Sequence, residues 1–321
     1  MDFHTLDPGS FEYGGSVEVA PLVRRVIAEN PSKFTYLGTG TYIVGRGDVA
    51  VIDPGPTLDS HRDALAAALS GDTVRAILVT HCHADHSPLA SWLAAETGAP
   101  TVAFGPHGES GWEIGSLPDD FGRPPADDEA AAEPVLEEST DTDFSPDVTV
   151  ATGDLAAEGD GWEMRAVHTP GHTSNHTCFT LQDGATGTLF TGDHVMGWST
   201  TVVGPPDGDM TAYMESLRVV AGRDDDVAIP THGPPIPNPS RYMNQLVEHR
   251  LDRERQVLGA VRAGRATIPA LVTDLYAEVR IELHRPAGAS VLAHLVKLVD
   301  DGVVAVDGGG RPRLDGTYVA V

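Results

Sequence analysis

Cysteine is scarce in this sequence: Cys82 and Cys178 are the only two among 321 residues. Two cysteines are too few for a disulfide framework, and reduced thiols are the default in a chain without export signals. The first residues carry no basic start followed by an apolar run, and no segment approaches about 20 uninterrupted apolar residues. We therefore expect a cytoplasmic protein without a membrane-spanning helix.

Basic residues are also few, since 21 Lys and Arg face 47 Asp and Glu and give a formal net charge of −26. Residues 241–321 hold 11 basic and 10 acidic side chains, which leaves 10 basic and 37 acidic ones in residues 1–240. An acidic surface repels a phosphate backbone, so RNA and DNA are disfavoured as partners. The same charge favours solubility, which requires no particular function.

The length and the 40% hydrophobic content suffice for one large domain and a smaller one, which we place at residues 1–240 and 241–321. In the larger domain, short β-like runs alternate with helical patterns, and this alternation indicates a layered α/β architecture. The expected strands cover residues 41–44, 49–53, 74–79, 162–167, 177–181, 187–191 and 226–230, and the expected helices cover 59–70 and 88–97.

Residues 106–160 interrupt this pattern with 16 acidic side chains against the single Arg123. So few apolar residues cannot form a core of their own. We expect an acidic insertion that is either a partly disordered surface excursion or a lid over the site.

From residue 241 onward the pattern becomes helical, with candidate helices at 242–261, 268–279 and 290–298 and a small hairpin from 303–306 and 316–321. Three helices and a hairpin are typical of a winged helix. Such modules often bind DNA, but this one is nearly neutral and has no basic recognition helix. We therefore expect a structural or dimerising role for it.

The strongest chemical signal is the segment from Thr80 to His86, which reads Thr-His-Cys-His-Ala-Asp-His at the end of an expected strand. Imidazole is a common zinc ligand, and Asp supplies a hard oxygen. Residues two apart in an extended segment share a face, so His81 and His83 can bind one ion together. A tight turn would then direct Asp85 and His86 toward a second ion.

Three later loops add a donor each, again after an expected strand. They are His168-Thr-Pro-Gly-His172, Thr191-Gly-Asp193-His and Pro230-Thr-His232-Gly. A polar turn explains any one of these loops as well as a metal ligand does. Together they complete two coordination shells.

With these motifs the sequence resembles the metallo-β-lactamase superfamily, whose H-x-H-x-D-H motif is matched by His81, His83, Asp85 and His86. The resemblance covers about residues 34–240 and implies an αββα sandwich. It implies one metal held by His81, His83 and His172, a second held by Asp85, His86 and His232, and Asp193 bridging both. Asp53 in Ile-Asp-Pro-Gly matches an acidic residue that supports the metal loop from behind.

The C-terminal module resembles the winged-helix tail of the subgroup typified by β-lactamase-like protein 2, which includes endoribonucleases and thioesterase-like enzymes. In that subgroup a second histidine follows the metal loop, and His176 stands there, either as a substrate contact or as a packed core residue. One departure is Gly38-Thr-Gly40 in place of a commoner Asn before the Thr-Tyr pair. We expect that neither this departure nor the acidic insertion touches a ligand, and that Cys82 points away from the metals.

The resemblance implies two zinc ions per chain, with iron or manganese as alternatives, that generate a bridging hydroxide at neutral pH. Asp85 or Asp193 would orient this nucleophile and relay a proton. The expected substrate is a small ester, thioester or lactone, ranked slightly above single-stranded RNA cut by an endoribonuclease. A mono-iron persulfide dioxygenase-like enzyme is a weaker alternative, because it leaves the second set of ligands without a use.

Overall fold

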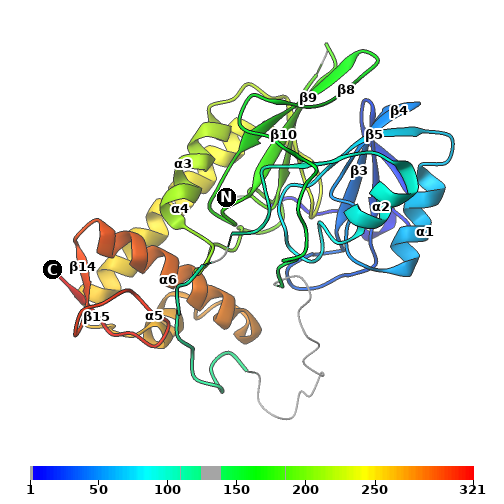
Figure 1. Cartoon of the computed structure of the whole chain (residues 1–321). Helices are drawn as coiled ribbons and strands as arrows, with labels where there is room; N and C mark the ends of the chain where they lie inside the picture. The colour runs from blue at the N-terminus through cyan, green and yellow to red at the C-terminus, as the bar shows by residue number, and fades with distance from the viewer. Residues whose placement is uncertain (1–2, 109, 124–138, 185) are drawn as a thin grey trace.

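The computed structural model describes residues 3–108, 110–123, 139–184 and 186–321. Two β-sheets pack face to face, helices cover their outer faces, and a helical module lies beside the second sheet at the C-terminal end (Figure 1). This is the expected αββα sandwich with a winged-helix-like module, and the α/β fold class is confirmed. No helix among the described residues is long and apolar enough to cross a membrane.

The first sheet has seven strands in chain order, and its outer face carries two helices, α1 (Asp59–Ala68) and α2 (Leu89–Thr97). Its strands are antiparallel as far as β4 and parallel from β4 onward. They are β1 (Ser16–Ala20), β2 (Val23–Ile27), β3 (Gly40–Arg46), β4 (Asp48–Ile52), β5 (Thr73–Leu78), β6 (Thr101–Ala103) and β7 (Val148–Thr149).

The second sheet has six strands in the order β13-β12-β11-β10-β9-β8. The helices α3 (Met210–Ala221) and α4 (Pro239–Arg262) pack on its outer face through an apolar cluster that includes Tyr213 and Met243. The strands are β8 (Leu155–Gly159), β9 (Trp162–His168), β10 (Thr177–Gln182), β11 (Gly187–Gly192), β12 (Val227–Pro230) and β13 (Ile236–Pro237).

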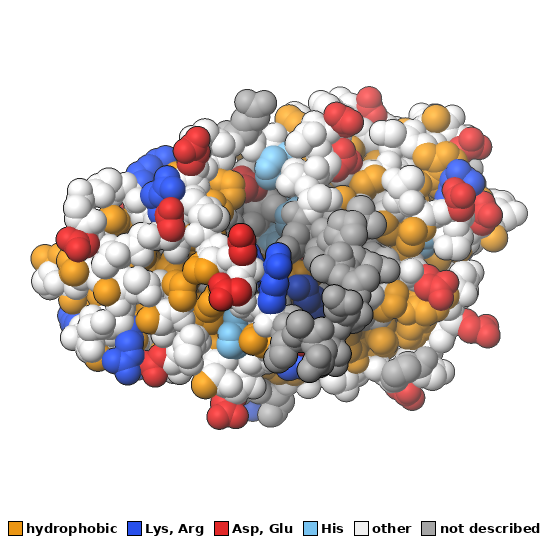
Figure 2. Space-filling model, turned by 90° about the horizontal axis from the view of Figure 1, so that it is seen from below, with side chains coloured by type: hydrophobic (Ala, Val, Ile, Leu, Met, Phe, Trp, Pro, Cys, Tyr) orange, Lys and Arg blue, Asp and Glu red, His pale blue; other side chains and the backbone are white. Residues whose placement is uncertain are grey.

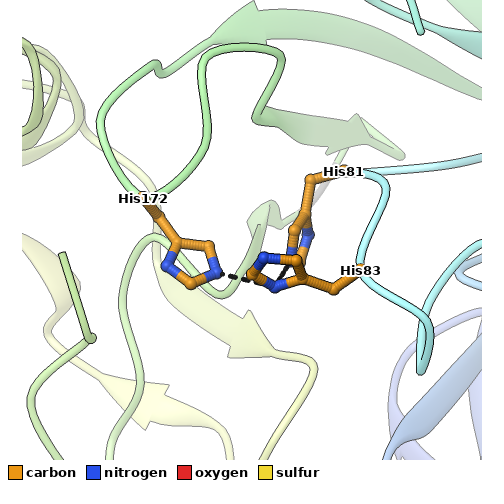
Figure 3. Close-up of side chains that lie close together, drawn as sticks. All are labelled: His81, His83 and His172. Atoms are coloured by element: carbon orange, nitrogen blue, oxygen red, sulfur yellow. Dashed lines mark hydrogen bonds between the residues drawn. The ribbon is translucent and has the colours of Figure 1, made fainter. Parts of the chain in front are cut away.

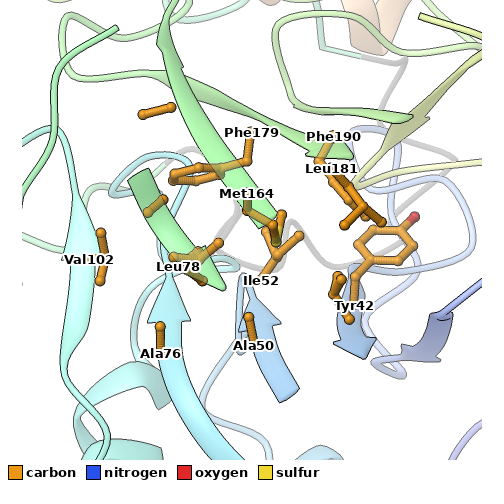
Figure 4. Close-up of a cluster of buried hydrophobic side chains, with 14 of the residues drawn as sticks. Tyr42, Ala50, Ile52, Ala76, Leu78, Val102, Met164, Phe179, Leu181 and Phe190 are labelled. Carbon is orange, nitrogen blue, oxygen red and sulfur yellow. The ribbon is translucent and has the colours of Figure 1, made fainter. Parts of the chain in front are cut away.

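The core lies between the two sheets (Figure 4). Tyr42 and Ile52 from the first sheet meet Met164 and Phe179 from the second, and all four are buried. Side chains alternate along a strand, so the neighbour Ile43 points the other way, into the cluster beneath α1 and α2. Strands buried on both faces explain why the sequence runs there are almost uninterruptedly apolar.

The C-terminal module contains α5 (Ile268–Leu275), a 3-10 turn η3 (Ile281–Leu283), α6 (His284–Asp300) and the hairpin of β14 (Val304–Val306) and β15 (Tyr318–Ala320). The expected boundary at 240/241 falls near the start of α4. The first half of α4 packs with the second sheet, and its second half packs with α5 and α6. One continuous helix therefore joins the two parts of the chain.

The described ends of the acidic segment 106–160 contact two different parts of the molecule. Residues 106–123 form no helix or strand among those described, and Leu117 from this stretch is buried against α5 and α6. Residues 139–160 contain β7 and β8, which extend both sheets of the sandwich. The described parts of the segment therefore pack with the rest of the chain, and residues 124–138, where the prediction of a surface excursion or lid also falls, lie outside the described residues.

Candidate metal centre

The expected ligands meet at one edge of the sandwich because each follows the carboxyl end of a strand. His172 follows β9, Asp193 follows β11 and His232 follows β12, and these three strands run in the same direction. His81 follows β5 in the other sheet. The backbone N–H of Thr177 donates to Thr80 O at 2.8 Å, which ties the two sheets together beside the site.

The first ligand group contains three histidines, His81, His83 and His172, whose ring nitrogens converge on one point (Figure 3). His83 Nδ1 lies 3.0 Å from His81 Nε2 and 3.2 Å from His172 Nε2. Nitrogen atoms this close suit ligands of a shared cation, since zinc binds imidazole nitrogen in tetrahedral sites.

The second ligand group contains Asp85, His86 and His232, all buried. Asp85 Oδ2 lies 3.2 Å from His232 Nε2 and 3.4 Å from His86 Nε2. The group combines one carboxylate with two imidazoles, a donor set that also suits zinc.

Asp193 lies between the two groups. Its Oδ1 is 3.4 Å from His232 Nε2, while its Oδ2 is 3.7 Å from His86 Nε2 and 3.9 Å from His172 Nε2. Among the described residues, neither Asp193 Oδ1 nor His86 Nε2 has a hydrogen-bond partner, although both atoms are buried. Buried polar atoms without partners are costly, and cations held between the two groups would satisfy them.

The electrostatics of the two groups differ. Burial and neighbouring histidines hold the pKa of His81 well below its ordinary value and lower that of His83 to about 3, so these rings are neutral. Burial also acts on His232, but Asp193 and Asp85 outweigh it and raise the pKa of His232 to about 10. Without a metal the second group is therefore held together by protons, which cation binding would release.

Asp53 supports the second group from behind, at the position expected for it. Its Oδ1 accepts the backbone N–H of Thr80 at 2.8 Å, and its Oδ2 lies 2.9 Å from His86 Nδ1 and 3.0 Å from Thr231 Oγ1. The carboxylate thus holds His86 Nδ1 as a donor and leaves Nε2 for a metal.

The loop between β2 and β3 also touches the ligands, so our expectation about Gly38-Thr39 was wrong. Thr39 Oγ1 donates to Asp85 Oδ2 at 2.7 Å, and Gly38 O accepts from His232 Nδ1 at 3.3 Å. Gly38 has a φ of 124°, and a Cβ there would lie 2.0 Å from Ala28 O. The backbone turn that reaches His232 therefore requires glycine.

Residues 201–202 position the first group and Asp193. Val202 O accepts from His172 Nδ1 at 2.7 Å, and Thr201 Oγ1 donates to Asp193 O at 2.8 Å. Arg250 of α4 is buried and donates from Nη2 to Thr201 O. The helix that joins the two parts of the chain thereby reaches the ligand loops.

His176 is fully buried and lies outside the cavity lining, so the structure does not place it as a substrate contact. Its Nε2 accepts the backbone N–H of Asp193 at 3.2 Å, while its Nδ1 lies 2.9 Å from Thr169 Oγ1. The ring therefore fixes the Asp193 loop.

Cys82 is buried among apolar side chains, and burial raises its pKa to about 11.

A cavity of about 650 Å³ opens onto the ligands. His83, Asp85 and Asp193 lie in its wall, and residues of the winged-helix-like module complete the other side. Figure 2, which views the molecule from below, shows histidine in a hollow near the centre of that face, with Lys or Arg side chains close by. A ligand of moderate size can therefore reach the candidate metal centre.

The comparisons with known proteins agree with this fold. Residues 36–232 match the family model described as metallo-beta-lactamase superfamily, and residues 267–311 match the beta-lactamase associated winged helix domain. The chain belongs to the metallo-beta-lactamase superfamily and is a metal-dependent hydrolase. The resemblance inferred from the sequence is confirmed.

Two curated relatives extend over nearly the whole chain. It is 31% identical to the atrochrysone carboxyl ACP thioesterase AgnL7 of Paecilomyces divaricatus, covering 90% of this chain and 83% of that protein. It is 27% identical to the lactamase-like protein ptaB of Pestalotiopsis fici, again over 90% and 83%. A beta-lactamase domain protein from Burkholderia ambifaria has the same fold, with a TM-score of 0.74, 22% identity and coverage of 99% and 97%.

Proposed function

We propose that this protein is a dinuclear zinc hydrolase that cleaves a small acyl thioester. The observation that carries the proposal is the pair of ligand groups with Asp193 between them. The first zinc would be held by His81, His83 and His172, the second by Asp85, His86 and His232, and Asp193 would contact both. When bound, zinc lowers the pKa of a coordinated water to about 7 and polarises a carbonyl group.

The chain's own carboxylates would orient the attacking water and accept its proton. Asp193 lies in the cavity wall, and its Oδ1 is 3.4 Å from His232 Nε2, whereas Asp85 Oδ2 is 3.2 Å from the same nitrogen and also accepts from Thr39. The freer oxygen belongs to Asp193, and we assign it the proton-accepting role and Asp85 the holding role. The buried hydrogen bonds of Asp53 and His176 keep both loops in place.

Thioesters are favoured over the other substrates of this chemistry by two observations. Curated relatives of matching length are named as acyl carrier protein thioesterases. The net charge of −26 opposes a polyanionic RNA, which keeps the endoribonuclease alternative below the thioesterase. A mono-iron dioxygenase would not use the second ligand group, which here is buried and well supported.

We also propose a cytoplasmic location, in keeping with two unpaired, buried cysteines.

Elemental mass spectrometry on the purified protein, before and after reconstitution with zinc, tests the metal assignment. We expect about two zinc ions per chain, together with hydrolysis of acyl thioesters in preference to lactones and single-stranded RNA. One iron per chain with oxidation of a sulfur substrate would refute the proposal in favour of a dioxygenase. RNA cleavage without thioester hydrolysis would refute the substrate class alone.

A further inference from the structure

The cavity has a second chemical feature besides the ligands: two cationic side chains in its wall. Lys33 comes from the loop between β2 and β3, and Arg285 comes from the first turn of α6. Lys33 is one of only two lysines in the chain, the other being Lys297. Both cavity cations are half-buried, so each loses part of its hydration there.

The two cations are brought together by direct contacts between the sandwich and the winged-helix-like module. Lys33 Nζ lies 3.4 Å from Glu282 O, directly before α6. Arg285 Nη2 donates to Pro118 O at 2.7 Å and to Asp119 O at 3.0 Å. Both side chains are thus held by backbone carbonyls, which fix their positions without neutralising their charge.

Neither cation is paired with a carboxylate of the described residues within 4.0 Å. Some other cations of this acidic chain do have such partners. Lys297 lies 2.6 Å from Asp301 and 3.3 Å from Glu254, and Arg75 lies 2.9 Å from Asp48. Because Lys33 and Arg285 line one cavity and have backbone carbonyls as their hydrogen-bond partners, they can together hold an anion of the ligand.

The remainder of the cavity suits the rest of such a ligand. Leu117, Met196 and Val202 provide apolar surface, and His83 and Asp193 bring the candidate metal centre into the same space. An anionic substrate is repelled by the overall charge of −26, so local cations are needed to hold it.

We propose that Lys33 and Arg285 form an anion-binding site for a charged group on the thioester substrate. The inference rests on the proposed thioesterase function. The anion is either a phosphate on the thiol half, as in a phosphopantetheine arm, or a carboxylate on the acyl half. In both cases the winged-helix-like module supplies a substrate-binding residue, which gives it a role that requires no DNA.

Matched substrates and charge-neutral variants test this site. One acyl group would be presented as its coenzyme A, phosphopantetheine and N-acetylcysteamine thioesters, of which only the last is uncharged on the thiol half. We expect Lys33→Gln and Arg285→Gln each to raise KM for the phosphate-bearing thioesters about tenfold, with kcat little changed. Arg280→Gln, an exposed cation on the same segment outside the cavity lining, serves as the control.

A second pair of substrates identifies which half carries the anion. N-acetylcysteamine thioesters of a dicarboxylic and a monocarboxylic acid of equal length differ only in the terminal carboxylate. A variant effect confined to the dicarboxylic thioester would place the anion on the acyl half. Equal KM changes for charged and uncharged substrates of both pairs would overturn the anion site.

Direct binding separates this inference from the proposed function. Calorimetry with coenzyme A and with a dicarboxylate would be run on the zinc-loaded protein and on both variants. If no thioester is hydrolysed but either probe binds about tenfold more weakly to the variants than to the wild type, the anion site stands and the function fails. If neither probe binds more weakly to the variants, the anion site is overturned whatever the activity.

Discussion

The two ligand groups lie a few ångströms apart, but different surroundings hold them. Behind the first group are neutral partners: Val202 O faces His172 Nδ1, and Thr80 Oγ1 lies 3.1 Å from His81 Nδ1. Behind the second group is the buried carboxylate of Asp53, which contacts His86, and Thr39 donates to Asp85. The first group is thus a neutral pocket of imidazoles, while the second is a network of charges.

This difference indicates that the two sites respond differently to change. Neutral imidazoles with lowered pKa values need no proton loss before they bind a cation. Charged, hydrogen-bonded partners raise the basicity of a ligand. The ligand loses this support if a single carboxylate is removed. We therefore expect the metal affinity of the second group to depend on its supporting residues more than the metal affinity of the first group does.

The largest expected effect follows from removing a ligand of the first group. His83→Ala should lower hydrolysis at least about a thousandfold, because it removes one of three donors that the first cation would share. The matched control is Trp92→Ala on α2, a partly buried residue outside the cavity. It should lower the free energy of unfolding by about 2 kcal/mol and leave kcat unchanged. Equal activity in wild type and His83→Ala would contradict the metal assignment.

The next effect separates the groups. Asp53→Asn removes the charge behind His86 and should weaken binding of the second cation about 10- to 100-fold. It should weaken binding of the first cation less, because Asp53 reaches His81 only through Thr80 Oγ1. Metal titration followed by elemental analysis would measure both affinities. Asp72→Asn, which affects a carboxylate paired with Arg24 away from the site, provides the control. Equal weakening of both cations would show that the two groups are not independently supported.

A smaller effect is expected from the joining helix. Arg250→Met leaves Thr201 O without its buried donor, which should cost about 1–3 kcal/mol of folding stability. The shift of residues 201–202 should weaken the first cation severalfold through His172. Arg250→Lys should restore part of both losses. Loss of stability with unchanged metal affinity would limit Arg250 to a packing role.

The smallest effect concerns pH in the metal-free protein, where the two groups act in opposite directions. The lowered pKa of His83, about 3, gives stability that is present above about 6.5 and lost as the pH falls toward 3. The raised pKa of His232, about 10, gives stability that is present below about 6.5 and lost as the pH rises through 10.

Urea unfolding of the chelator-treated protein at several pH values measures both effects, each expected at about 1–2 kcal/mol over two pH units. His83→Asn should flatten the acid side of the profile, and His232→Asn the alkaline side. If one of these variants leaves the pH dependence of the free energy of unfolding unaltered, the shifted pKa of the replaced histidine does not contribute to folding stability.

Some elements outside the expected set carry a recognisable sequence signal. The alternating Ser-Val-Glu-Val-Ala of β1 has the period of a strand, and α3 begins after Asp209, whose side chain accepts from Ala212 N. Both signals are local. The β7 and β8 strands are harder to predict, because β7 has two residues and both stand within an acidic stretch.

From the sequence alone, the strand pattern indicated a layered α/β architecture and the spacing of His81 to His86 indicated metal donors, because both are local properties of the chain. The superfamily and the sandwich followed from the resemblance that these motifs carry. Only the tertiary structure decided what surrounds those donors. Thr39 contacts Asp85 across 46 residues and Gly38 contacts His232 across 194, and no local pattern encodes such pairs. The same holds for Lys33 and Arg285, which reach one cavity only because α4 returns the C-terminal module to the site.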